Sequence, residues 1–577
     1  MADSPRLLRI NSMSHQTRVV KLWLAAALLA VIHGPWARAA EVKAGDELFT
    51  DGAITHLRVE VAATDMEILR AYVFRREVRQ EERTSARCTV REGTNAWSNV
   101  AIHLKGSLGS FRGVEETPSF TLNFSKHVAR QRFHGLEKIS LNASIQDPTW
   151  VSEKLCRELY TRGGIPVPRA GYATAELNGR RLGFYVLLEG WNRQFIERHF
   201  ADARGPLYEG PFLTDIDQPP IVAYGRATGG SLGIAKLLDA AREPNPAKRL
   251  ARLGTVLDLD RFTRLLALDL LSWNGDGYAM HVNNYRIFHD RKKERLVFLA
   301  HGMDQMFTIP DAPLLAGGDG MVAWAVLSLP EGRQRVLEQI REVRQSIFQP
   351  EAMRRRALEI ALPVGLALGR EAGISNAAPP AHSQAVLDWV QRITERIASI
   401  DQQLAGLSNL VSLRSGQSLV PLLWKHRAVA GTPIFQQPAE PPSLNIRTVT
   451  GSSGAWVATQ WLEQGRYRLQ GRVRQVPGPT TNQMTCGFQI RAPRKRSLGS
   501  DWGWDGRRRV GTDDRFILAD QTQPPAAGTN WTELTCEIDL RQPVADLEIL
   551  CTASGDGEAW FDLASLRLTR LTDPGRD

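Results

Sequence analysis

Apolar and polar residues follow different patterns in the two halves of this chain. Between residues 50 and 405, apolar runs of strand length are mixed with stretches whose apolar residues recur at helical spacing, which predicts an α+β body. One such stretch, residues 382–407, is expected to be a helix that packs back onto this body. From residue 445 onward, short alternating runs separated by glycine-rich turns predict an all-β, jelly-roll-like sandwich.

These patterns divide the chain into four parts. Residues 1–39 combine basic residues, an apolar run and a small-residue cleavage pattern, which together are typical of a secretory signal peptide. We expect the α+β body at residues 42–425, a proline-rich linker at 426–444 and the sandwich at 445–575. No later segment has the apolar length of a bilayer span, so the mature protein is expected to be periplasmic or secreted, without a transmembrane segment.

A predicted hairpin carries polar side chains at its open end. Residues 285–289 and 295–300 have the pattern of two strands joined by a polar turn. Paired strands lie about 5 Å apart, so Asn284, just before the first strand, is expected to approach the segment that carries Asp304 after the second. Two oxygen-bearing side chains placed in this way are candidate ligands of one divalent cation, Mg²⁺ or Mn²⁺.

The order of these residues favours a phosphoryl-transfer site of the kinase type. Asp276, upstream of the hairpin, is the candidate that orients or deprotonates an acceptor hydroxyl, while Asn284 and Asp304 are the candidate metal ligands. Taken singly, each residue is more typical of a turn or a solvated loop than of a metal site. The step from Asp276 to Asn284 is longer than the matching step in ordinary protein kinases, so a eukaryotic-type kinase is not expected.

Two upstream segments extend this interpretation to a bound nucleotide. Lys105 and Ser107 begin a loop rich in glycine, where small residues let backbone N–H groups approach phosphates, although a plain turn explains these glycines equally well. Residues 184–189 predict a strand that ends at Glu189 and runs into a short helix, as a hinge between two lobes does. We therefore expect ATP to contact Lys105 and Ser107 and to lie beside Glu189.

Residues 50–405 resemble the CotH family of spore-coat-type atypical protein kinases. The resemblance rests on LKGSLGSFRG and PSFTLNF, on the run from GLEKISLNASIQDPTW to GWNRQFIERHF, and on the hairpin. It implies a two-lobed, protein-kinase-like fold and transfer of the ATP γ-phosphate to Ser or Thr hydroxyls of a protein substrate. Asp276 matches the family's catalytic Asp, and Asn284 matches its Asn before the aromatic strand.

The chain departs from this family at one acidic position. The family's pair, usually Trp-Asp-x-Asp-x-x-Phe, becomes His-Gly-Met-Asp here, so Gly302 replaces the first carboxylate and only Asp304 remains. A site with one carboxylate fewer binds a divalent cation less tightly. This loss favours an alternative, a catalytically inactive kinase-like surface or matrix protein that binds glycans through its sandwich. Transfer of AMP in place of phosphate is a third possibility.

Composition and charge indicate the class of partner. The chain has 577 residues, of which 43% are hydrophobic and 23% charged, with a net charge of +10. Basic clusters within the sandwich favour acidic partners such as an anionic glycan or a cell-envelope component, whereas the export signal and the lack of a reader motif argue against nucleic acid. Trp502 and Trp504 lie in a loop-like segment and are candidates for stacking on sugar rings, while Trp456, Trp461, Trp531 and Trp560 are assigned to the core.

Five cysteines are few for a chain of this length, so the fold is not expected to depend on disulfides. Cys536 and Cys551 are the first candidates for one bridge, if their strands are neighbours. No cysteine spacing supports a zinc site, and no GxSxG motif supports a serine hydrolase.

Overall fold

The structure, a computed structural model, divides into two compact units, residues 1–47 and residues 48–577. Its described residues are 43–74, 84–210, 212–226, 232–315, 319–374, 376–406, 413–421, 424–479, 484–493, 516–522, 525, 528–540 and 544–571. The predicted signal peptide at residues 1–39 lies outside them. Within these ranges, no helix combines the length and the apolar character that a bilayer span requires.

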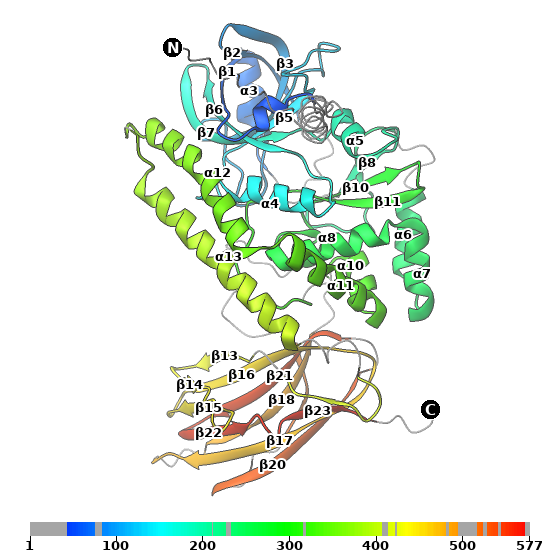
Figure 1. Ribbon diagram of the computed structural model, residues 1–577, viewed down its shortest axis with the longest axis vertical. Coiled ribbons are helices and arrows are strands. Elements are labelled where there is room, and N and C mark those ends of the chain that lie inside the picture. The colour runs from blue at the N-terminus through cyan, green and yellow to red at the C-terminus, as the bar shows by residue number, and fades with distance from the viewer. Residues whose placement is uncertain are drawn as a thin grey trace, which may run out of the picture. The chain divides into compact units, whose positions relative to one another are not determined.

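The N-terminal part of the second unit contains a closed barrel of strands (Figure 1). All neighbouring strands are antiparallel except β1 and β6, whose parallel pairing closes the barrel. In spatial order the strands are β1 (Ile54–Val61), β2 (Ala86–Glu92), β3 (Asn95–Lys105), β4 (Ser119–Asn123), β5 (Lys138–Asn142), β7 (Arg180–Glu189) and β6 (Ala170–Leu177). The short helices of this region are α2 (Asp46–Phe49) and α3 (Ala63–Ala71).

The alternation that builds the barrel core is clearest in β5. In β5, Ile139 and Leu141 are fully buried in the barrel core, whereas Lys138, Ser140 and Asn142 are only partly buried. Successive side chains of a strand point to opposite faces, so the apolar set fills the barrel and the polar set faces outward.

After the barrel, a four-stranded sheet is combined with helices. The predicted hairpin is confirmed as β10 and β11, whose antiparallel register pairs Tyr285 with Ala300. The sheet order is β11 (Arg295–Ala300), β10 (Tyr285–Asp290), β8 (Leu207–Glu209) and β9 (Ile221–Tyr224). The helices are α4 (Ser152–Arg162), α5 (Arg193–His199), α6 (Leu232–Ala241), α7 (Pro246–Val256), α8 (Leu259–Ser272), α9 (Tyr278–His281), α10 (Met321–Leu327), α11 (Pro330–Ser346), α12 (Pro350–Glu371) and α13 (Pro380–Gly406). The body thus mixes helices and strands as predicted, while its two-lobed, kinase-like arrangement stays a prediction.

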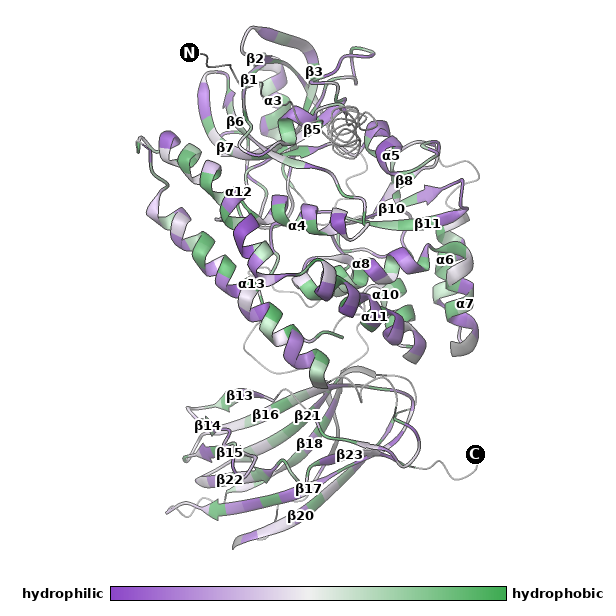
Figure 2. Cartoon of the chain, viewed as in Figure 1, coloured by the Kyte–Doolittle hydropathy of each residue, from purple (hydrophilic) through white to green (hydrophobic). Residues whose placement is uncertain are grey.

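Helix α13 supports the loop that follows α8. Helices α12 and α13 lie side by side (Figure 1), and polar and apolar residues alternate along both (Figure 2). From α13, the fully buried Arg396 donates from Nη2 to the carbonyl of Leu270 at 2.6 Å and from Nε to that of Leu271 at 3.2 Å. These carbonyls belong to the last turn of α8, where Leu270 also accepts from the backbone of Trp273 at 3.4 Å, so Arg396 helps to satisfy the end of this helix.

The C-terminal part is a β-sandwich, as predicted. Leu469 and Phe561 of one sheet share a core with Phe488 and Ile549 of the other. The first sheet has the order β12 (Ser418–Leu419), β23 (Arg567–Arg570), β17 (Gly465–Pro477), β22 (Gly557–Asp562), β15 (Ser443–Thr448) and β14 (Ile434–Gln436), with β20 (Gly528–Leu540) also paired to β17. The second has the order β13 (Lys425–Ala430), β16 (Ser453–Leu462), β21 (Val544–Ser554), β18 (Thr485–Pro493) and β19 (Phe516–Gln521).

Two expectations about this region are wrong. The proposed linker at residues 426–444 contains strands of the sandwich, because β13 pairs with β16 and β14 pairs with β15. Prolines between these short strands had indicated a linker. The proposed bridge is wrong as well, since no disulfide joins Cys536 and Cys551 in the described residues. Their strands, β20 and β21, belong to different sheets.

The division of the tryptophans into buried and exposed residues differs in part from the prediction. Trp456 is buried as expected, but Trp531 is 38% exposed and Trp560 is partly exposed. Both were assigned to the core because they lie in strands. In β22, however, Ala559 and Phe561 on either side of Trp560 fill the inward positions and leave Trp560 on the outer face. Trp502 and Trp504 lie outside the described residues.

Candidate functional site

Asp276 is held by two amide side chains. Helix α8 ends at Trp273 in a left-handed conformation, and the short helix α9 follows the loop that carries Asp276. Asn283 donates from Nδ2 to Asp276 Oδ1 at 3.0 Å, and Asn284 donates from Nδ2 to Oδ2 at 2.7 Å. Burial raises the pKa of Asp276, an effect that these two hydrogen bonds and the charge of His281 oppose. The carboxylate is therefore fixed in position beside the hairpin.

Asp304 lies within electrostatic range of Asp276. Burial is the main reason that the pKa of Asp304 rises to about 7, and the negative charges of Glu153, Asp147 and Asp276 raise it further. Four carboxyl groups thus gather around the loop that follows β11. A cation bound there would relieve their mutual repulsion.

The N-terminus of α4 holds the Asp304 loop. The Ser152 hydroxyl donates to the carbonyl of Met303 at 2.6 Å, and the Ser152 backbone N–H donates to Asp147 at 3.1 Å. Asp147 also accepts from the backbone and the hydroxyl of Thr149, at 2.9 and 2.5 Å. Sequence reasoning gave Asp147 and Ser152 no role, although an acidic residue shortly before a helix is a recognisable start signal.

Strand register connects Lys105 to this same region. Lys105, the last residue of β3, pairs with Ser119 at the start of β4, and the Ser119 hydroxyl contacts Asn142 Oδ1 at 3.5 Å. Asn142 accepts from the backbone of Ser144, whose hydroxyl donates to the carbonyl of Asp147 at 3.0 Å. A continuous path of hydrogen bonds thus runs from the barrel end with Lys105 to the loop with Asp304.

The loop after Lys105 is a closed turn. Ser107 accepts from the backbone of Phe111 at 2.8 Å, and its own N–H donates to the Ser110 hydroxyl at 3.2 Å. Gly106 has φ +107°, and a Cβ there would lie 2.9 Å from the Cα of Phe111, so only glycine allows this close approach. Contact of Ser107 with a phosphate stays a prediction.

Glu189 is engaged by two arginines at the end of β7. It accepts from Arg169 Nη2 at 3.0 Å and from both terminal nitrogens of Arg198. Burial would raise the pKa of Glu189, but these guanidinium groups hold it below its usual value. Two residues further on, Trp191 Nε1 donates to His301 Nδ1 at 3.3 Å. The carboxylate therefore has a structural role, while the predicted hinge contact with nucleotide stays a prediction.

Asn284 occupies the space beside Gly302. A Cβ on Gly302 would lie 2.7 Å from Asn284 Cγ, and Gly302 has φ +57°, a conformation that favours glycine. The carboxylate that the family carries at this position would therefore collide with Asn284 as it stands.

The oxygen donors here suit a magnesium or manganese ion. Asn284 and Asp304 offer hard oxygens, and Mg²⁺ commonly takes one or two protein carboxylates and completes its shell with water and phosphate oxygens. The crowded charge around Asp304 fits a cation in the same way. Among the described residues, no group of three or more His, Cys, Asp or Glu side chains is arranged to hold a metal.

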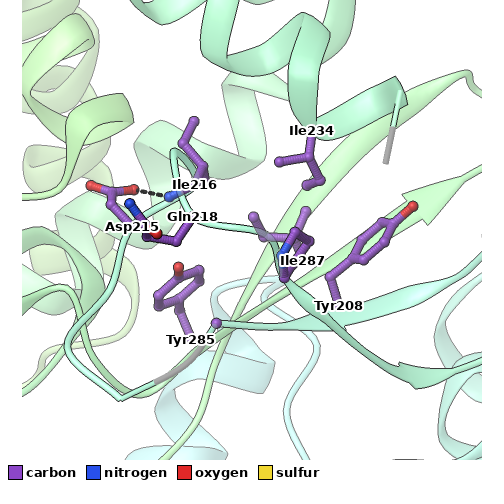
Figure 3. A pocket seen from close by; sticks show the side chains of 9 residues that line it. Tyr208, Asp215, Ile216, Gln218, Ile234, Tyr285 and Ile287 are labelled. Atoms are coloured by element: carbon purple, nitrogen blue, oxygen red, sulfur yellow. Dashed lines mark hydrogen bonds between the residues drawn. The ribbon is translucent and has the colours of Figure 1, made fainter. Parts of the chain in front are cut away.

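A small cavity beside the hairpin supplies no further chemistry. It is lined mainly by apolar side chains and has room for roughly one water molecule (Figure 3). Its carboxylate, Asp215, accepts from the backbone of Ile216 at 2.7 Å, the hydroxyl of Tyr278 at 2.9 Å and the backbone of Met321 at 2.6 Å. Asp215 thus ties α9, just after Asp276, to the start of α10.

Part of this chain is similar in sequence to known proteins. The family described as CotH kinase protein matches residues 102–378. Inner spore coat protein H of Bacillus subtilis is 25% identical over 171 residues, which are 27% of this chain and 46% of that protein. Invasin CotH3 of Rhizopus delemar is 21% identical over 237 residues, which are 37% of this chain and 38% of that protein. The chain thus spans less than half the length of either relative.

Among solved structures, the CBM22-1 xylan-binding domain of Paenibacillus barcinonensis Xyn10C is 14% identical, with a TM-score of 0.20. The match covers 28% of this chain and 100% of that domain. The segment that matches the family includes Asp276, Asn284 and Asp304. These matches support a CotH family assignment for this chain, through residues 102–378.

Proposed function

We propose that the CotH domain is an exported atypical protein kinase that transfers the ATP γ-phosphate to Ser or Thr hydroxyls of a protein. The observation that carries the proposal is the joint placement of Asp276, Asn284 and Asp304 at the open end of one hairpin. Phosphoryl transfer depends mainly on positioning of the reactants and on stabilisation of the charge that develops, and these three residues are suited to both.

Each residue has a distinct part in this proposal. Asp276, fixed by Asn283 and Asn284, accepts the proton of the acceptor hydroxyl or orients that hydroxyl for attack. Asn284 Oδ1 and Asp304 hold the metal ion, which neutralises charge on the phosphates when bound. Lys105, at the barrel end that leads to Asp147, contacts the phosphates.

Transfer of label from ATP tests this function. Purified protein is incubated with γ-labelled ATP and Mg²⁺ or Mn²⁺, beside Asp276→Ala, Asp304→Ala and the control Asp260→Ala, whose side chain is 87% exposed. We expect both site variants to lower incorporation by about 10²- to 10⁴-fold and the control to leave it unchanged. Equal signals in all four proteins would identify a contaminating kinase, and label only from the α position would indicate AMP transfer.

A second candidate function is a kinase-like surface protein without catalysis. It is favoured by Gly302, since Asn284 fills the space of the missing carboxylate. Absence of both γ- and α-label transfer with either metal would support it.

A further inference from the structure

An arginine lies between two tryptophans on the outer face of the sandwich. Arg474 of β17, Trp531 of β20 and Trp560 of β22 lie on adjacent strands, and the register pairs Arg474 with Trp560. The guanidinium carbon is 5.2 Å from the ring centre of Trp531 and 5.2 Å from that of Trp560. The three side chains thus form one continuous aromatic and cationic patch.

Arg474 differs from the other arginines on this face. Arg447 pairs with Glu558 at 2.6 Å, Arg468 pairs with Glu537 at 2.7 Å, and Arg472 pairs with Asp562. Within the described part of the chain, Arg474 has no carboxylate partner, and its Nε has no hydrogen-bond acceptor. A positive charge without a counter-ion is therefore placed between two indole rings.

The patch is accessible and its rings are held in place. Trp531 is 38% exposed, while Trp560 and Arg474 are partly exposed. The Trp560 Nε1 donates to Glu558 at 3.2 Å, which fixes the orientation of that ring. A guanidinium stacked on aromatic rings uses its flat face, so its terminal N–H edge stays available for a planar anion.

These features indicate which class of ligand the patch can bind. A carboxylate matches the N–H edge of a guanidinium through two parallel hydrogen bonds. Indole rings offer wide apolar surfaces, against which the C–H faces of sugar rings pack. The two ring centres lie no farther apart than twice their distance to Arg474, so one short oligosaccharide reaches all three side chains.

We propose that Trp531, Arg474 and Trp560 form a binding site for an acidic oligosaccharide. A uronate carboxylate pairs with Arg474, and neighbouring sugar rings pack against the two indoles. This site is independent of phosphoryl transfer, and it lies on strands other than the segment with Trp502 and Trp504 that the sequence had suggested.

Calorimetric titration of the full chain with oligogalacturonate tests the site. We expect Arg474→Ala and Trp531→Ala each to weaken binding by at least about tenfold. The binding free energy of one charged hydrogen bond, or of one buried aromatic contact, corresponds to about that change in affinity. The matched control is Arg466→Ala, which removes an equal charge from the same strand and is expected to change affinity less than twofold. Thermal unfolding of each variant confirms that it is folded.

Three outcomes would overturn the proposal. The first is no binding of oligogalacturonate by the wild-type chain. The second is an equal loss in Arg474→Ala and Arg466→Ala, which would mean attraction to the overall positive charge. The third is equal affinity of the wild-type chain for a neutral oligosaccharide of the same length. Conversely, Arg474→Lys is expected to give intermediate affinity, since it keeps the charge and loses the paired hydrogen bonds.

Discussion

Asn284 donates from its side-chain amide to Asp276 Oδ2 at 2.7 Å and to the Asp276 backbone carbonyl at 3.2 Å. The residue proposed to hold the metal is thus directly bonded to the residue proposed to act on the acceptor hydroxyl. With its amide nitrogen committed to Asp276, Asn284 keeps Oδ1 as its remaining acceptor for a cation. A movement of either residue therefore displaces the other.

Replacing Asn284 is expected to remove two contributions at once. Asn284→Ala takes away a metal ligand and one of the hydrogen bonds that fix Asp276, so we expect phosphate transfer to fall by at least about a hundredfold. Asn283→Ala is the matched control, because Asn283 also donates to Asp276 but is not proposed to bind metal. Its expected loss is about tenfold. Equal losses in the two variants would remove Asn284 from the set of metal ligands.

Restoring the family's carboxylate at position 302 is expected to fail. Gly302→Asp places a Cβ against Asn284 in a left-handed conformation, so we expect a loss of about 1–3 kcal/mol in the free energy of unfolding and no gain in transfer. Gly302→Ala introduces the same Cβ without the charge, and denaturant unfolding should show a similar loss. A Gly302→Asp protein that is more active and equally stable would show that Asn284 moves aside readily.

Neutralising Glu189 is expected to destabilise the domain. Glu189→Gln leaves Arg169 and Arg198 without their shared carboxylate, at a cost of about 2–4 kcal/mol in the free energy of unfolding. Glu197→Gln breaks a pair with Arg193 in which both side chains are largely exposed, and it should change stability by less than about 0.5 kcal/mol. Similar values for the two variants would contradict the structural role of Glu189.

Asp269 is expected to make stability depend on pH. It is buried and accepts from the Tyr160 hydroxyl at 2.6 Å and from Asn274 at 2.9 Å, and burial raises its pKa to about 6. The folded state thus holds this proton more tightly than the unfolded state does, so stability falls as pH rises from about 4 to 6. By pH 7.5, ionisation of Asp269 lowers the free energy of unfolding by roughly 3 kcal/mol.

Asp269→Asn removes this titration. The free energy of unfolding of the variant minus that of wild type should therefore be about 2 kcal/mol larger at pH 7.5 than at pH 4.5. Denaturant unfolding at the two pH values measures this difference. The surface variant Asp260→Asn, which removes a carboxylate from the same helix and leaves Asp269 in place, serves as the control. A pH-independent difference between Asp269→Asn and wild type would contradict the raised pKa.

The sequence was sufficient to predict the elements that carry local patterns. The hairpin of β10 and β11 was predicted to within one residue, because its apolar strands flank a polar turn. Helix α13 was also predicted, since Val386, Val390 and Ile393 recur at helical spacing and are buried in the structure. The contact of Asp276 with Asn284 lies ahead of this hairpin, across α9, and the hairpin pattern alone did not predict it.

Contacts between segments distant in the sequence could not be predicted in this way. Asp147 and Ser152 support the Asp304 loop from about 150 residues upstream, and no local pattern reports such a contact. Trp531 is a different case: it shares the polar face of β20 with Glu533 and Thr535, so alternation along the strand places it outward, and the assignment to the core overlooked this pattern. Proline-rich spacing likewise concealed the strands β13 and β14.

The parallel contact between β1 and β6 determines which fragments of this chain can be expressed. The family match begins at residue 102, inside β3, yet the barrel is completed only by β1 and β2, which precede it. A protein cut at the family boundary would leave the hydrogen-bonding groups of β6 and β3 bare, and such open sheet edges associate with one another. Fragments for biochemical work should therefore begin ahead of Ile54, since trimming to the segment that matches the family would yield a protein that aggregates.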